Sequence, residues 1–207
     1  MNSTRQLQSA CALFALLSLT GARAEGLPID HKLNFDNSGV WKRGVQLTLV
    51  NSVVFGTAAL ALWEGSDTRA GRTAWQSVDS IALGAISSET LKRVVQRPRP
   101  RQNSDPDEVR WGAGYYSFPS GEVTAITAAI TPFVLEYAHD NPIVYGLYAL
   151  PAYDAVARLK SNAHWQSDVL AGFALGTLTG YYAHSRETPL SIRILPHAVT
   201  VGLSTRF

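Results

Sequence analysis

The segment 157–168 holds residue types that can act on a phosphorylated molecule. Arg158, His164 and Asp168 all lie in it, and His164 and Asp168 are four residues apart. On a helix this spacing places both side chains on one face, one turn apart. A carboxylate there can accept a hydrogen bond from one ring nitrogen, which leaves the other as a base or nucleophile. Taken alone, such a His/Asp pair is more often a structural hydrogen bond than a catalytic dyad.

Two earlier segments change this interpretation. Lys92 is followed seven residues later by Arg99 and then Pro100, and Phe118-Pro119-Ser120-Gly121-Glu122 opens a long apolar segment. In this order the three segments resemble the signature of the type-2 phosphatidic acid phosphatase and vanadium haloperoxidase superfamily. That signature reads K-x(6)-R-P, then P-S-G-H, then S-R-x(5)-H-x(3)-D. The resemblance covers residues 92–168, and it departs from the family at Ala157, where the family has serine, and at Glu122, where it has histidine.

Phosphoryl transfer asks a protein mainly for positive charge and for position. Three cations stand in the signature segments, and the start of the helix after Pro119 adds free N–H groups and a favourable dipole for an anion. The predicted phosphate-binding residues are Lys92, Arg99, Ser120, Gly121 and Arg158. The predicted catalytic residues are His164 as nucleophile, Asp168 as its orienting carboxylate, and Glu122.

Glu122 stands where, by the resemblance, the family has the histidine that protonates the leaving alkoxide. A carboxylic acid can do this only if burial raises its pKa, whereas neighbouring cations lower it. Three outcomes stay open: an acid that works at low pH, a substrate with a good leaving group such as a diphosphate, or a protein that binds phosphates without turnover.

No metal or cofactor is expected, because the other histidines have no ligand-like spacing. Arg93, Arg97 and Arg101 belong to a run of cations that we interpret as surface. Of the chain's 207 residues, 46% are hydrophobic and 16% charged, which predicts one domain over residues 25–207. Beyond residue 24 the chain has 16 basic and 16 acidic residues, which disfavours a nucleic-acid partner.

Residues 1–24 have the pattern of a signal peptide. Arg5 precedes a short apolar run over residues 10–19, and Ala22-Arg23-Ala24 predicts cleavage before Glu25. The single cysteine, Cys11, lies in this leader, so the mature chain has none. Export then predicts a periplasmic protein, at or in the inner membrane.

The periodicity of the remaining chain predicts an all-α bundle of about five to six helices. Predicted helical segments are 45–63, 73–96, 122–137, 143–160 and 163–184, with Ser161-Asn162 as the cap of the last and a polar loop over 101–117. Alternation after Pro189 predicts a short β-hairpin or extended tail. Residues 45–63 suit a membrane-spanning helix and a buried bundle helix equally well.

Two functions follow from these patterns. The first is a metal-independent phosphatase acting through a phosphohistidine on a phosphate or diphosphate ester of a membrane lipid, with a soluble phosphate ester as the alternative substrate. The second is a catalytically silent binder of phosphorylated lipid, made so by Glu122. A haloperoxidase is disfavoured, because such chains are usually much longer.

Overall fold

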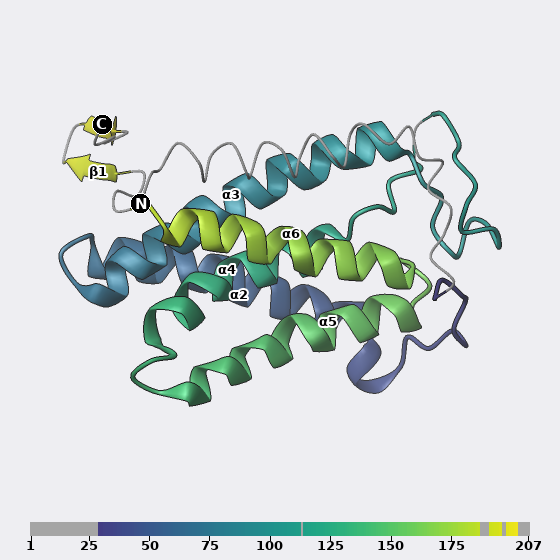
Figure 1. Cartoon of the computed structure of the whole chain (residues 1–207), viewed down its shortest axis with the longest axis horizontal. Helices are drawn as coiled ribbons and strands as arrows, with labels where there is room; N and C mark the ends of the chain where they lie inside the picture. The colour runs from purple at the N-terminus through teal and green to yellow at the C-terminus, as the bar shows by residue number, and fades with distance from the viewer. Residues whose placement is uncertain (1–28, 113, 187–190, 196–197, 203–207) are drawn as a thin grey trace.

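Helix α4 forms the centre of the molecule. The computed structural model describes residues 29–112, 114–186, 191–195 and 198–202, so the predicted signal peptide lies outside the described residues. Within those ranges five α-helices form a bundle, as predicted, and two strands form an antiparallel hairpin (Figure 1). The elements are η1 Gly39–Trp41, α2 Arg43–Glu64, α3 Arg69–Val95, α4 Gly121–Tyr137, η2 Pro142–Tyr148, α5 Ala149–Lys160, α6 Gln166–His184, β1 Ser191–Leu195 and β2 Ala198–Gly202.

Small residues let α6 lie directly against α4. A Cβ atom on Gly172 would approach the carbonyl oxygen of Ser120 to 2.6 Å, and one on Gly176 would approach that of Thr124 to 2.6 Å. The backbones therefore touch along this face, which larger side chains would prevent. Ile126, Ala128 and Ala129 of α4 are almost fully buried. The close packing of α4 and α6 therefore depends on the glycines of α6.

Several element boundaries differ from the predicted ones for identifiable reasons. Helix α3 begins at Arg69 because the Thr68 hydroxyl accepts a hydrogen bond from the Gly71 N–H at 2.9 Å. The predicted helix over 143–160 is instead a 3-10 segment followed by α5. Pro151 falls in the first turn of α5, where the missing N–H costs nothing. Ser161-Asn162 does not cap α6, which begins at Gln166 after Trp165.

One end of the bundle gathers the segments that carry the predicted site. Helices α3 and α5 end there, and α4 and α6 begin there (Figure 1). The 101–117 loop and residues 29–42, here called the N-terminal arm, lie at the same end. The arm is fastened by hydrogen bonds between Asp36 N–H and the Lys160 carbonyl at 2.9 Å, and between His31 N–H and the Gln166 side chain at 3.0 Å.

Helix α2 lies on the outside of the bundle. Only 11% of its most apolar 18-residue window is buried, which excludes the predicted alternative of a buried bundle helix. Phe55 and Trp63 are 68% and 88% exposed. By length and composition α2 can cross a membrane, with a mean hydropathy of 1.7.

Candidate active site

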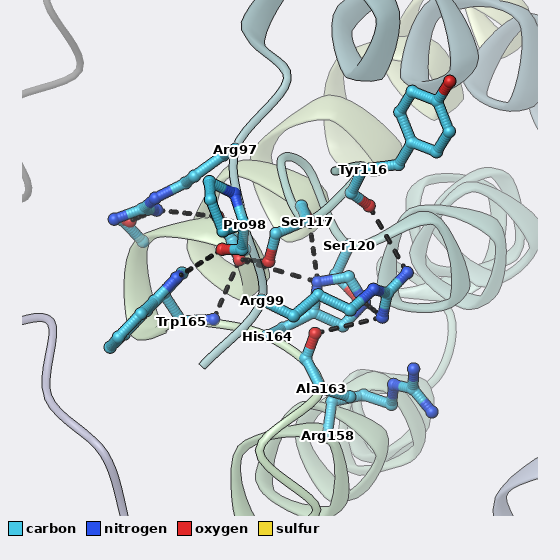
Figure 2. Close-up of polar contacts among 12 residues, drawn as sticks. Arg97, Pro98, Arg99, Tyr116, Ser117, Ser120, Arg158, Ala163, His164 and Trp165 are labelled. Carbon is cyan, nitrogen blue, oxygen red and sulfur yellow. Dashed lines mark hydrogen bonds and ion pairs between the residues drawn. The ribbon is translucent and has the colours of Figure 1, made fainter. Parts of the chain in front are cut away.

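His164 is buried at the start of the turn that leads into α6, with only 4% of its surface exposed. Its Nδ1 lies 2.8 Å from the backbone carbonyl oxygen of Ser117, which can only accept a hydrogen bond (Figure 2). The proton of the neutral ring is therefore on Nδ1, and Nε2 carries the free lone pair. This is the arrangement that a nitrogen nucleophile needs.

Asp168 also lies beside this ring, but the Ser117 carbonyl is the nearer acceptor of the ring proton. Asp168 Oδ2 is 3.6 Å from His164 Nδ1, while it accepts hydrogen bonds from the Trp165 N–H at 2.8 Å and from the Ser117 hydroxyl. The bond to Trp165 starts the helix at Gln166, so His164 precedes α6 and is not part of it. Burial lowers the pKa of His164 to about 4, against the raising effect of the Asp168 carboxylate. The ring is thus neutral at physiological pH.

Arg99 reaches the other ring nitrogen. Its Nη1 is 3.4 Å from His164 Nε2 and donates to the Ala163 carbonyl at 3.0 Å. In Figure 2 the side chains of Arg99 and Arg158 extend to the same side of His164. Burial, followed by the charges of Arg158 and Arg101, lowers the pKa of Arg99 to about 10. Cations held this close to one another favour an anion between them.

Lys92 and the N-terminus of α4 meet on the same site. A Cβ atom on Gly121 would lie only 2.9 Å from Lys92 Nζ, so any larger residue would displace that ammonium group. Burial lowers the pKa of Lys92, with a smaller effect in the same direction from Arg99. Ser120 is the N-cap residue of α4, but its hydroxyl makes no cap bond and has no hydrogen-bond partner among the described residues. That buried hydroxyl and the first N–H groups of α4 remain available to a phosphate.

Glu122 is engaged by two arginines. Arg43 of α2 donates to its two carboxylate oxygens at 2.7 and 2.6 Å, and Arg158 Nη1 lies 3.7 Å away. Burial favours the neutral carboxyl group, but the Arg43 hydrogen bonds and the charges of Arg158, Arg43 and His164 outweigh it. The pKa of Glu122 is therefore held below its ordinary value. Arg158 also donates to Gln46 at 3.1 Å.

A cavity of about 480 Å³ opens beside these groups. Four arginines and one carboxylate line it, so its wall carries an excess of positive charge. The lining residues are Phe35, Asn37, Arg43, Arg99, Arg101, Glu122, Arg158, Ser161 and Ala163. The structure thus brings all eight predicted site residues to one end of the bundle.

The interpretation of Arg97 as a surface residue is wrong. It is 2% exposed, and its Nη1 donates to Asp168 Oδ1 at 2.7 Å while its Nη2 donates to Asp30 Oδ2 at 2.7 Å. Gln96 adopts a left-handed conformation at the end of α3, which turns the chain so that Arg97 points inward. Sequence reasoning also missed Asp30 and Arg43, because nothing in the composition of the N-terminal arm or of α2 marks either residue as part of a site.

No group of three or more potential metal ligands occurs within the described ranges. A buried histidine with a free Nε2, facing several cations and a helix N-terminus in an all-α bundle, defines a candidate phosphoryl-transfer site. The sequence profile of the PAP2 superfamily matches residues 73–189, more than half of the chain. The chain belongs to the PAP2 superfamily.

Three proteins are similar to parts of this chain. A segment of 71 residues is 39% identical to the lipid A 1-phosphatase of Porphyromonas gingivalis and covers 33% of this chain but only 16% of that protein. A transmembrane PAP2-type phosphatidylglycerolphosphate phosphatase from Bacillus subtilis has 17% identity and a TM-score of 0.46, with 70% of each chain covered. LpxE from Aquifex aeolicus has 16% identity and a TM-score of 0.46, covering 70% of this chain and 87% of that one.

Proposed function

We propose that this protein is a phosphoric ester hydrolase that acts on a phosphorylated membrane lipid through a phosphohistidine at His164. The observation that carries the proposal is the fixed tautomer of His164, whose Nε2 lies 3.4 Å from an arginine in a cluster of buried cations. The relatives that match are named as phosphatases of lipids, which supports the choice of substrate class. The chemistry needs no metal, because protein cations supply the charge.

In the first step Nε2 of His164 attacks phosphorus in line with the leaving oxygen. Lys92, Arg99, Arg158, the Ser120 hydroxyl and the first N–H groups of α4 hold the phosphoryl oxygens, whose charge they stabilise. The attack places positive charge on the ring. The Ser117 carbonyl at 2.8 Å from Nδ1 and the Asp168 carboxylate at 3.6 Å stabilise that charge.

The ionisation state of Glu122 determines which leaving groups can depart readily. Its low pKa leaves it ionised at neutral pH, so it cannot protonate a departing alkoxide. A diphosphate avoids this requirement, because the departing phosphate is already a stable anion. We therefore infer that lipid diphosphates are hydrolysed faster than the matching monophosphates at neutral pH.

An ionised Glu122 suits the second step. Release of phosphate requires water to attack the phosphohistidine, and a carboxylate near the ring can accept the proton of that water. Glu122 lies close enough for its charge and that of His164 to affect each other. The same residue that hinders alkoxide departure thus assists hydrolysis of the intermediate.

We further propose that the protein is exported, with residues 1–24 removed as a signal peptide, and works at the membrane. The exposed apolar surface of α2 supports membrane insertion, with Phe55 and Trp63 facing outward. Export of alkaline phosphatase fused after residue 42, ahead of α2, and resistance of the native protein to alkaline carbonate extraction, test the two parts separately. Full release by carbonate contradicts the membrane part.

The test of activity uses purified protein, farnesyl phosphate and farnesyl diphosphate in the presence of EDTA, with phosphate release as the measurement. The expected result is turnover that is lost in His164→Ala, together with a labelled phosphoprotein that is stable to base and labile to acid. Turnover that survives in His164→Ala contradicts the phosphohistidine route.

A catalytically silent lipid-phosphate binder is the second candidate. The bidentate Arg43–Glu122 ion pair favours it, because it occupies a cation that phosphate could use and holds a negative charge near it. Binding of both farnesyl phosphates in the micromolar range without phosphate release from pH 5 to 8 supports this candidate over the enzyme.

A further inference from the structure

Arg97 lies buried between two carboxylates from opposite directions. It donates to Asp168 at 2.7 Å on one side and to Asp30 at 2.7 Å on the other. The side chains of Arg97 and of both aspartates are 3% or less exposed. Charges this well removed from water interact strongly and are little affected by salt.

Asp30 belongs to the N-terminal arm, yet it also binds the first turn of α6. Its Oδ1 accepts from the Ser167 N–H at 2.8 Å, and its Oδ2 accepts from the Ser167 hydroxyl at 2.6 Å. Arg97 in turn donates to the same hydroxyl at 2.7 Å. Asp30 therefore fixes both Arg97 and the helix start that carries Asp168.

The combined charge of Asp30, Arg97 and Asp168 affects the electrostatic potential at His164. Arg97 with Asp168 alone makes a neutral pair, which would cancel most of the negative potential that Asp168 exerts on the ring. Asp30 neutralises Arg97, so the three groups together carry one negative charge. Attack on phosphorus makes the His164 ring positive. The single net negative charge of the three groups stabilises that positive ring.

We propose that Asp30 is a positioning and charge-balancing residue of the active site, contributed by the N-terminal arm, that lets Asp168 stabilise the cationic state of His164. The inference rests on the proposed role of His164 as nucleophile. It makes the N-terminal arm part of the site, although no signature segment of the sequence includes it.

The test compares Asp30→Asn, Arg97→Gln and the double variant, which are expected to leave net charges of zero, minus two and minus one on the three groups. The matched control is Asp36→Asn, on the same arm, whose carboxylate accepts hydrogen bonds from the Ser38 N–H and hydroxyl and from no other residue that the structure describes. Asp30→Asn is expected to lower kcat about tenfold, equivalent to one pKa unit at His164, with KM changed less than about twofold. The double variant is expected to regain most of that loss, and the control to match the parent.

A second readout does not need turnover. The His164 pKa, followed by NMR of the labelled imidazole, is expected to rise in Arg97→Gln and to return towards the parental value in the double variant. Arg99, Arg158, Glu122 and Asp168 face this ring and are unchanged in all variants. Melting temperatures separate these effects from loss of the fold.

Two outcomes would overturn the proposed role of Asp30. An unchanged His164 pKa in folded Arg97→Gln overturns it, as does a double variant no better than Asp30→Asn. If the parent protein releases no phosphate from any substrate, the proposed hydrolase fails, while the NMR series still decides whether Asp30 and Arg97 set the charge at His164.

Discussion

Replacing Glu122 with histidine restores the family residue of the second signature segment and should change monoester and diphosphate hydrolysis to different extents. Against the raising effect of burial, the hydrogen bonds from Arg43 and the charge of Arg158 hold the pKa of Glu122 below its ordinary value, so Glu122 is almost entirely ionised at pH 7. A histidine with its ordinary pKa of about 6.5 is protonated in roughly a quarter of molecules at that pH, and the same cations make this fraction an upper bound. General-acid help is typically about 10²–10⁴-fold.

We therefore expect Glu122→His to raise farnesyl phosphate hydrolysis about 100-fold at pH 7, and farnesyl diphosphate hydrolysis less than about threefold. The side chain of Arg43 is 40% exposed, so water can replace its lost partner at a cost of about 1 kcal/mol or less. In the parent protein, monoester turnover should rise about tenfold for each unit that pH falls from 7 to 5, because the fraction of protonated Glu122 rises in that proportion.

The assay is initial phosphate release with both substrates from pH 5 to 8, with Glu122→Gln as the control. Glutamine removes the negative charge and the proposed base of the second step without adding an acid. Because loss of that base would slow both substrates alike, the ratio of monoester to diphosphate hydrolysis separates relief of repulsion from proton donation. Equal acceleration of both substrates by Glu122→His would refute the reasoning about the leaving group. Equal acceleration of the monoester by glutamine and histidine would show that repulsion, not missing acid, limits the parent protein.

Three further variants and two controls test the packing and charge of the bundle by chemical unfolding. Arg97→Ala should cost about 3–5 kcal/mol because it leaves two buried carboxylates unpaired, whereas the exposed Arg93→Ala should stay within about 0.5 kcal/mol. Gly176→Ala should cost about 1–3 kcal/mol, because its Cβ would meet α4 at 2.6 Å; Gly56→Ala, with nothing within 4 Å of its Cβ, should be neutral or stabilising. Burial raises the pKa of Asp154 to about 7, so the contribution of Asp154 to folding stability falls as pH rises from 3.8 to 7, whereas the lowered pKa of His164 acts in the opposite direction. Asp154→Asn should therefore stabilise the protein relative to the parent by up to about 4 kcal/mol more at pH 7 than at pH 3.8; an unchanged difference between the two proteins contradicts this.

The fold class and the catalytic candidates could be predicted because they depend on local sequence. Helical periodicity and proline positions indicate the bundle, and the resemblance of residues 92–168 to the family signature makes Lys92, Arg99 and His164 candidates. The helix boundaries were predicted less well, because caps such as Thr68 and the Asp168–Trp165 bond act through side chains that pattern reasoning does not resolve.

What could not be predicted depends on contacts between segments far apart in the chain. Asp30 and Arg97 are 67 residues apart, and Arg43 and Glu122 are 79 residues apart. The competing effects on the Glu122 pKa were identified from the sequence, but their balance depends on Arg43, which lies in an otherwise apolar helix. Likewise, the nearest acceptor of the His164 ring is a backbone carbonyl, and a backbone group leaves no trace in residue identities.

The contact between α4 and α6 also bears on how this site can change over evolution. The Ser120 N–H donates to the Asp168 carbonyl at 2.9 Å, and glycines hold the two backbones together below that bond. The start of α4, which we propose binds phosphate, and the segment that carries His164 thus form one unit, in which a substitution on one side is expected to displace the other. The N-terminal arm supplies Phe35 and Asn37 to the cavity wall from outside that unit. Under the proposed function, changes at these two positions are expected to alter which headgroup is accepted while the reacting groups keep their geometry, so new substrate preferences could arise through few mutations.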